Sequence, residues 1–268
     1  MSSQGNNFRS IEVALDATGV GTVVINRPDR LNALNGSAID ELVRALEWLG
    51  SESRCRVVVL AGRGTSFCAG MDMSSGLGSR PFDDPVLETE YGVRRAVEVV
   101  KVMRRIPQPI VVAVQGHAVG AGFAIAAAAD IRIASTDAQF NAVFVKIGVS
   151  AGDLGLTWIL PRIIGSGRAA DLLLRGGVLN ADDALAQGFV SSISEDPRVV
   201  AESTAHEIAA LPAYGVAATK QLLNASVDAA GLDQHLESEL RAQTVGLLTA
   251  DHKAAVASFR DRRLATRN

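Results

Sequence analysis

The chain has 268 residues, of which 48% are hydrophobic and 21% are charged, and this indicates a globular protein with a large core. The net charge of -3 and a pI near 5.8 provide no basic surface for nucleic acid, and no apolar stretch is long enough for a membrane span. Cys55 and Cys68 are too few for a disulfide framework, and they and the four histidines lack metal-ligand spacing. We therefore expect a reduced, cytoplasmic protein that binds no nucleic acid, membrane or metal.

The predicted elements begin with a hairpin. Ile11–Leu15 and Thr22–Ile25 flank a glycine-containing turn and are typical of two antiparallel strands. A polar loop with Pro28 follows, and Ser37 is a suitable N-cap for a helix that ends near Leu49.

Two β-branched runs, Arg56–Leu60 and Ile110–Val114, predict buried strands that each lead into a glycine-bearing segment. These segments are Ser66–Met73 and Gln115–Gly122, and each continues toward a helix. A strand that ends in small residues and opens a helix leaves backbone N–H groups free to bind an anion. If the two turns converge, they form an oxyanion hole for an enolate or a tetrahedral anion. The alternative is that both are only tight turns that allow close helix packing.

Between these turns we expect a helix from Val86 that ends before Pro107, and after them a buried core helix and a short strand, Asp130–Ala134. The β-strand pattern then nearly stops, and from Pro197 to Arg263 the pattern is helical. This order predicts an α/β core over residues 1–196 and a helical C-terminal region over 197–268.

Along nearly its whole length the chain resembles the crotonase (enoyl-CoA hydratase/isomerase) superfamily. The matching blocks occur in the family's order, and they are Asn26–Leu34, Phe67–Asp72, Pro109–Gly122, Ala129–Ala134, Leu160–Gly165, Ala184–Val190 and Ala257–Arg263. The resemblance implies a spiral of ββα units with a helical C-terminal trimerisation region, and a homotrimer or homohexamer.

The resemblance also implies an acyl-CoA substrate whose thioester carbonyl accepts hydrogen bonds from the backbone amides of Met71 and Ala121. Coenzyme A is then part of the substrate, and no separate cofactor is expected. The implied substrate contacts are Arg30, Leu31, Ala33, Ala69, Gly70, Asp72, Met73 and Arg262. Two of these have other interpretations: Asp72 is also suited to cap the next helix, and Arg262 to sit on a solvated helix end.

The acid–base residues depart from the family pattern. Hydratases of the family resemble one another in carrying glutamate at two positions. In this chain the corresponding residues are Ala124 and Phe144, and neither side chain can transfer a proton. A carboxylate remains at Asp153, at about the place where isomerase and dehalogenase branches carry an aspartate. Asp153 is either a proton carrier or the N-cap of a helix from Leu154. Other candidate groups are Glu88, Glu90 and His117, which we rank lower.

We therefore expect an enoyl-CoA hydratase/isomerase-type enzyme that stabilises a thioester enolate. One alternative is a non-catalytic acyl-CoA-binding homologue that lacks both glutamates. Another is a Clp-type serine hydrolase on a similar spiral core, which would need a reactive serine with histidine and aspartate partners.

Overall fold

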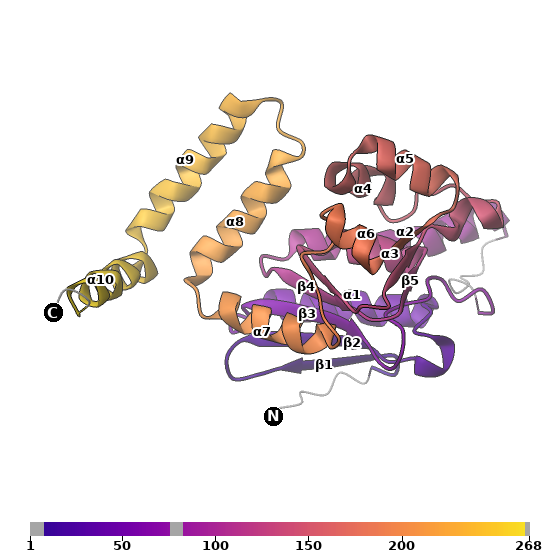
Figure 1. Cartoon of the computed structure of the whole chain (residues 1–268), viewed down its shortest axis with the longest axis horizontal. Helices are drawn as coiled ribbons and strands as arrows, with labels where there is room; N and C mark the ends of the chain where they lie inside the picture. The colour runs from indigo at the N-terminus through magenta and orange to yellow at the C-terminus, as the bar shows by residue number, and fades with distance from the viewer. Residues whose placement is uncertain (1–7, 76–82, 266–268) are drawn as a thin grey trace.

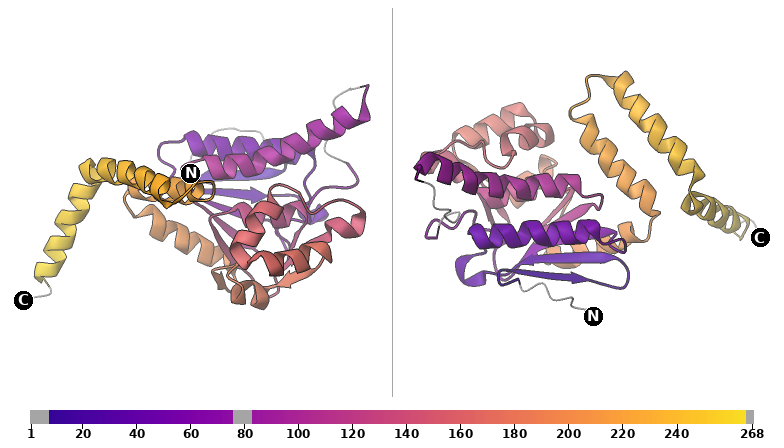
Figure 2. Two further views of the ribbon diagram at one scale, coloured as in Figure 1. Left: turned by 90° about the horizontal axis from the view of Figure 1, so that it is seen from above. Right: turned by 180° about the vertical axis from the view of Figure 1, so that it is seen from behind.

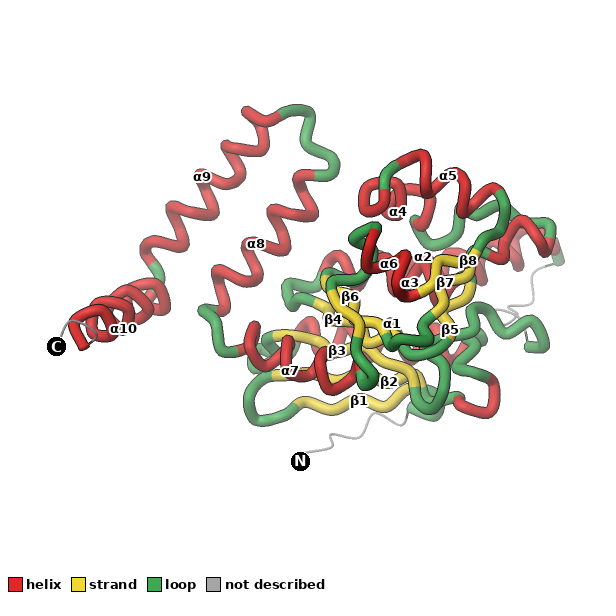
Figure 3. Tube along the Cα trace, in the orientation of Figure 1, coloured by secondary structure: helices red, strands yellow, loops and turns green. Residues whose placement is uncertain are grey.

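The computed structural model describes residues 8–75 and 83–265, and for residues 259 and 261–265 it describes the backbone only. Figure 1 shows a mixed α/β core from which a chain of C-terminal helices extends to one side. Figure 3 separates the two regions by their secondary structure, since the strands lie only in the core.

A six-stranded sheet forms the centre of the core. Its strands, in spatial order, are β1 (Ile11–Leu15), β2 (Val20–Ile25), β3 (Val57–Gly62), β4 (Ile110–Val114), β6 (Ile131–Ala134) and β9 (Ser192–Ile193). The hairpin β1–β2 is antiparallel, as predicted, and every other neighbouring pair is parallel. Parallel strands share one C-terminal edge, so the segments that follow β3 and β4 emerge close together.

A second sheet of three short strands contains β5 (His117–Val119), β7 (Gln139–Asn141) and β8 (Val178–Asn180). Strand content is low after Ala134, as expected, but three short strands that were not predicted, β7, β8 and β9, follow it. These strands are two or three residues long, and so short a segment carries no alternating pattern that distinguishes it from a loop.

The helices connect and cover the strands. They are α1 (Gly36–Ser51), α2 (Pro85–Arg105), α3 (Ala121–Ala128), α4 (Leu156–Ile164), α5 (Ser166–Leu174), α6 (Ala181–Ala186), α7 (Pro197–Ala209), α8 (Ala213–Ser226), α9 (Leu232–Leu248) and α10 (Ala250–Ala265), with the short 3-10 helices η1 (Pro28–Arg30) and η2 (Val143–Ile147). The predicted N-cap Ser37 is wrong: the side chain of Asn35 accepts the Ala38 N–H at 2.9 Å instead. None of the described helices is long and apolar enough to cross a membrane.

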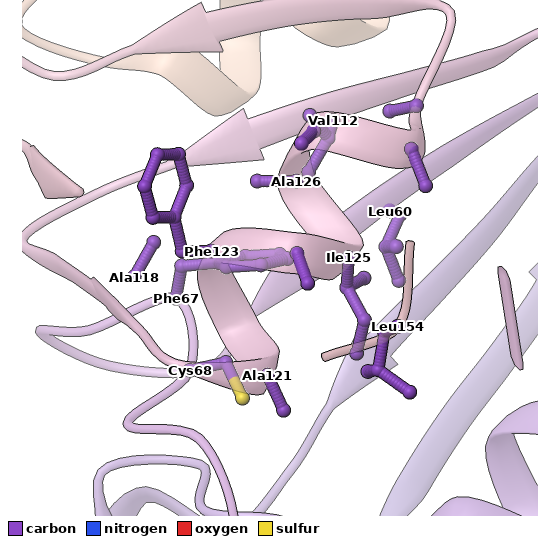
Figure 4. Packing of buried hydrophobic residues seen from close by; sticks show 14 of the residues in the cluster. Leu60, Phe67, Cys68, Val112, Ala118, Ala121, Phe123, Ile125, Ala126 and Leu154 are labelled. Carbon is purple, nitrogen blue, oxygen red and sulfur yellow. The ribbon is translucent and has the colours of Figure 1, made fainter. Parts of the chain in front are cut away.

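The sheet is buried on both faces. Along β3, Val58 and Leu60 belong to the large core with α1, α2 and α3, whereas Val57 and Val59 contact the alanines of α7. This alternation follows from the two-residue period of a strand. The core helix predicted between the second turn and Asp130 is confirmed as α3, all eight of whose residues are buried. Figure 4 shows its side chains within the large core.

The last three helices project from the core as an arm (Figures 1 and 2). The arm is attached through Lys220 of α8, which is 4% exposed. Its ammonium donates to the carbonyls of Met103 and Gln108, both at 2.8 Å, and pairs with Asp130 at 2.9 Å. Because α7 covers the sheet, the projecting part begins only with α8. The division into regions 1–196 and 197–268 stays a prediction.

Candidate active site

The structure brings the two glycine-bearing segments together at the C-terminal edge of the large sheet. Cys68 donates its N–H to the carbonyl of His117 at 3.0 Å, and Val119 returns an N–H to the carbonyl of Cys68 at 2.9 Å. These bonds form a parallel bridge between Cys68 and Ala118. The segments after β3 and β4 thus run side by side into one site, as their positions after neighbouring parallel strands predict.

Two glycines allow this close approach. Gly70 has a φ of +90°, and a Cβ built on it would lie 2.7 Å from the Val119 carbonyl oxygen and 3.6 Å from the Ala121 nitrogen. A Cβ on Gly122 would lie only 2.3 Å from the carbonyl oxygen of Cys68. Any side chain at either position would separate the two turns. Figure 4 accordingly shows Cys68 beside Ala121 at the N-terminal end of α3.

Two backbone amides at this junction are available to a ligand. Neither the N–H of Met71 nor that of Ala121 donates to an acceptor within residues 8–75 and 83–265. Ala121 is the first residue of α3, where the helix dipole adds positive potential. Together the two N–H groups can donate to one oxygen atom that develops negative charge.

The loop that contains Arg30, Leu31 and Ala33 lies directly on the first turn. Ala69 donates its N–H to the Leu31 carbonyl at 2.9 Å, and Leu34 donates to the Gly70 carbonyl at 2.7 Å. Most of the residues predicted to bind substrate are therefore grouped around Met71. Arg30 and Met73 are exposed beside them, Met73 to 81%.

The alternative interpretation of Asp72 as a helix cap is wrong for the described residues. Its carboxylate pairs with Arg27 at 2.9 Å and accepts the Ser74 hydroxyl at 2.6 Å, while the first described helix after it is capped by Asp84. The Ser74 hydroxyl and the Arg27 guanidinium hold the pKa of Asp72 well below its usual range.

Arg27 and Asn32 are residues that the sequence analysis missed as parts of this site. The Asn32 side chain is fully buried, and its amide donates to the carbonyls of Arg63 and Ser66 at 2.8 and 2.7 Å. Arg27 and Asp72 are 45 positions apart in the chain, so no local spacing relates them.

Asp153 is half-buried in the segment between η2 and α4. The alternative that Asp153 caps the following helix is wrong, because α4 begins at Leu156, its N-cap is Gly155, and no side chain caps that end within the described part of the chain. Burial raises the pKa of the Asp153 carboxyl. Its neighbour Leu154 is in the same buried cluster as Ala121 (Figure 4).

Apolar side chains occupy the two positions that carry glutamate in hydratases. Ala124 is fully buried on α3. Phe144 is 4% exposed, and its ring lies 3.6 Å from the position where Gly120 would carry a Cβ. The second turn is therefore bordered by a phenyl ring.

The remaining candidates are two glutamates of α2, His117 at the junction of the turns, and Arg262. Glu90 pairs with Arg94 on the exposed side of α2. Glu88 is half-buried on the same helix, and His117 is exposed. The side chain of Arg262 lies outside the described residues, so its predicted contact with CoA stays a prediction.

The described residues contain no group of three His, Cys, Asp or Glu side chains that could hold a metal ion. A cavity of about 540 Å³ lies elsewhere, at the opposite ends of β4 and β6, where Pro109, Ile131 and Leu211 line it beside α8. It is therefore separate from the glycine-bearing turns.

Comparisons with known proteins agree with this architecture. The profile of the enoyl-CoA hydratase/isomerase family matches residues 16–266. A probable enoyl-CoA hydratase of Mycobacterium leprae (strain TN) is 35% identical over 257 residues, covering 91% of this chain and 85% of the relative. The 1,2-epoxyphenylacetyl-CoA isomerase of Escherichia coli K12 is 34% identical over 246 residues, with 90% and 92% covered.

Among solved structures, the enoyl-CoA hydratase from Bacillus anthracis superposes with a TM-score of 0.86 at 27% identity, covering 95% of this chain and 97% of that one. The α/β core with its C-terminal helices thus has the fold of the solved enoyl-CoA hydratases. The family match spans almost the full chain, and the relatives are matched over most of their length. This chain belongs to the enoyl-CoA hydratase/isomerase family of the crotonase superfamily and is an acyl-CoA enzyme of that family.

Proposed function

We propose that this enzyme moves a proton on an acyl-CoA thioester through an enolate, with the amides of Met71 and Ala121 as the oxyanion hole and Asp153 as the proton carrier. The observation that carries the proposal is Asp153, a half-buried carboxyl group with a raised pKa that caps no helix, on the segment leading into a helix packed against α3.

The oxyanion hole rests on two N–H groups that have no acceptor among the described residues and that converge where Gly70 approaches Ala121. Each such donor is worth about 2.7–4 kcal/mol in the transition state. Two donors on one oxygen therefore contribute substantially to stabilising an enolate.

The reaction that best fits one carboxylate is a double-bond shift. Asp153 takes a proton from C2 of a 3-enoyl-CoA, and the electron pair moves through the thioester into the carbonyl oxygen. The protonated Asp153 then returns the proton to C4, which leaves the double bond between C2 and C3. A raised pKa suits this exchange, because the same group must accept and then release the proton.

Hydration of a 2-enoyl-CoA fits less well. Water addition needs a group that activates the water and a group that delivers a proton. Ala124 and Phe144 offer neither, and both are buried apolar side chains. The relatives include proteins named as probable enoyl-CoA hydratases and one named as an isomerase, so the apolar side chains at these two positions carry this preference.

For the CoA part of the substrate we propose contacts with the loop of Arg30, Leu31 and Ala33 and with Arg262. Ala69, Gly70 and Met73 would surround the thioester, and Asp72 lies next to the proposed donor Met71, with its carboxylate paired to Arg27. Coenzyme A enters and leaves as part of the substrate, and the mechanism uses no further cofactor.

We also propose that the enzyme assembles as a homotrimer or homohexamer through its helical arm. Helix α9 has no buried residue, and Leu232, Leu236 and Leu240 on one of its faces are 71%, 46% and 59% exposed. Leucines four residues apart on one helix are typical of a face that another surface covers. A monomer in sedimentation velocity at micromolar concentration would contradict this assembly.

The experiment for the activity is product analysis with a panel of thioesters. We expect 3-hexenoyl-CoA to become 2-hexenoyl-CoA, and crotonyl-CoA to be hydrated far more slowly. The panel includes a 3,5-dienoyl-CoA and 1,2-epoxyphenylacetyl-CoA, the latter because of the relative's name. Rapid hydration of crotonyl-CoA would contradict the proposal. Tight acyl-CoA binding without any turnover would favour the non-catalytic alternative.

A further inference from the structure

Arg27 connects two segments that meet at Met71. Its guanidinium donates to the carbonyl oxygen of Ala33 and, through Nη2, to Oδ2 of Asp72 at 2.9 Å. Its backbone N–H donates to Oδ1 of Asn32 at 2.9 Å. The side chains of the ion pair are only 16% and 7% exposed, so solvent screens it much less than a surface pair.

The peptide that carries the Met71 amide is held from the other side as well. Leu34 donates its N–H to the carbonyl of Gly70 at 2.7 Å, and its own carbonyl accepts the N–H of Asp72 at 2.9 Å. The residues on either side of Met71, Gly70 and Asp72, are thus each hydrogen-bonded to the backbone of Leu34, and Asp72 is also held by its ion pair with Arg27. A shift of the loop relative to the turn would change the direction of the Met71 N–H.

The loop does not have a relaxed backbone. Leu31 and Asn32 have φ values of 48° and 58°, and left-handed conformations in consecutive residues other than glycine are unfavourable. The side-chain bonds of Asn32 and the bond from Arg27 to Ala33 hold this conformation. The geometry of the loop thus depends on contacts with the turn that bears Met71.

We infer that Arg27 and Asp72 form a positioning pair that couples occupancy of the loop by the CoA part of the substrate to the alignment of the Met71 amide; this rests on the proposed function. The nucleotide end of CoA, bound on the loop, acts through Arg27 and the hydrogen bonds to Leu34 to fix the donor for the thioester oxygen. Asp72 is then a positioning residue and not a direct substrate contact.

The chemistry of the pair explains why an arginine is needed. The planar guanidinium presents separate N–H groups that reach the Ala33 carbonyl and the Asp72 carboxylate at the same time. A lysine ammonium on a flexible stem lacks this fixed fork. Asparagine at position 72 would still accept the N–H of Ser74, so the turn keeps its local bond while the ion pair is lost.

The test compares Arg27→Lys and Asp72→Asn with the wild type and with the control Glu47→Gln. The control removes the Arg105–Glu47 ion pair, 3.0 Å long, which joins α1 to α2 near their C-terminal ends. For each protein, kcat and KM are measured with 3-hexenoyl-CoA and with the 3-hexenoyl thioester of N-acetylcysteamine, which lacks the nucleotide. The carbonyl infrared band of bound butyryl-CoA, labelled with ¹³C, reports hydrogen bonding to the thioester without turnover.

In the wild type we expect the nucleotide to raise kcat as well as affinity, because remote binding energy is used for alignment. Both variants should lose about 10-fold or more in kcat for the CoA thioester, with little change in its Kd. In both variants the kcat for the CoA thioester divided by the kcat for the N-acetylcysteamine thioester should fall toward one. The shift of the bound butyryl-CoA carbonyl band should also become smaller. Glu47→Gln should behave as wild type.

The outcomes separate this inference from the proposed function. A wild-type protein that shifts the carbonyl band, together with variants whose band and kcat ratio are unchanged, would overturn the positioning pair and leave the oxyanion hole intact. Absence of any shift in the wild type would overturn the oxyanion hole itself and the inference with it.

Discussion

Replacing Gly70 by alanine tests whether the close approach of the two turns is required for catalysis. The new Cβ would lie 2.7 Å from the Val119 carbonyl oxygen, whereas ordinary contacts begin at 3.4 Å. One of the two turns must therefore retreat by about 0.7 Å. The displaced peptide immediately precedes the Gly120–Ala121 peptide, which carries one of the two proposed oxyanion donors.

Two effects contribute to the expected magnitude. A side chain at a φ of +90° costs about 1–2 kcal/mol in the free energy of unfolding, and the clash adds to this loss. A misplacement of about 1 Å in a catalytic arrangement can cost about 100-fold in rate, so we expect kcat to fall by about 10- to 100-fold. The assays are urea unfolding and the isomerisation of 3-hexenoyl-CoA.

Gly188→Ala is the matched control. Gly188 has a comparable φ of +73°, but nothing lies within 4 Å of its Cβ position, so this variant has the backbone strain without the clash. We expect it to lose stability by about 1–2 kcal/mol and to keep its full kcat. If Gly70→Ala kept wild-type kcat and lost no more stability than Gly188→Ala, the tight junction would not be needed for function.

Three further changes have defined outcomes. Asp153→Asn should reduce kcat by about 100-fold or more and leave acyl-CoA affinity nearly unchanged. Its free energy of unfolding in urea should also change little, because the side chain caps no helix. An unchanged rate on a good substrate would end the catalytic assignment of Asp153. Lys220→Met should lower the free energy of unfolding by about 1–3 kcal/mol, because the carbonyls of Met103 and Gln108 lose their buried donor and Asp130, which keeps Arg104 at 3.8 Å, loses its closer cation; calorimetry that finds no change would refute this. The His206 imidazole donates through Nε2 to the Asp16 carboxylate at 3.0 Å, and this bond raises the pKa of His206. The pair therefore stabilises the fold below the ordinary histidine value of 6.5, and this contribution disappears as the pH rises through the folded-state pKa. The stability difference between wild type and His206→Asn should therefore shrink as the pH rises above 6.5, and a difference that does not vary with pH would contradict the assignment.

The strands and helices with strong patterns were predictable from the sequence. The valine-rich runs of β3 and β4 and the alanine-rich α3 are recognisable because burial on all sides removes polar residues from them. The convergence of the two turns was also predictable, because neighbouring parallel strands end at one edge. The short strands β7, β8 and β9 were not predictable, since tertiary pairing and not local propensity forms them.

Residues whose role depends on a distant partner were the hardest to assign. Aspartate is a residue type that commonly caps helices, but the Asp72 carboxylate instead accepts hydrogen bonds from the Arg27 guanidinium and the Ser74 hydroxyl. Asp153 precedes a helix closely enough to cap it, yet Leu154 at a φ of +47° and Gly155 lie between the carboxylate and the first turn. In both cases the deciding factor is a backbone conformation or a contact that composition does not encode.

The two cysteines provide a means of observing how the core opens. Burial raises the pKa of Cys55 to about 11 and that of Cys68 to about 12, so almost no thiolate exists at neutral pH in the folded protein. Alkylation of either sulfur therefore has to wait for a local or global opening of the chain.

Cys68 lies at the junction of the two turns, whereas Cys55 lies at the other end of β3. Their separate alkylation rates would report the opening free energies of these two places without any introduced probe. The protein thus carries a natural pair of labels for comparing motion at the edge of the sheet that holds the proposed site with motion at its opposite edge.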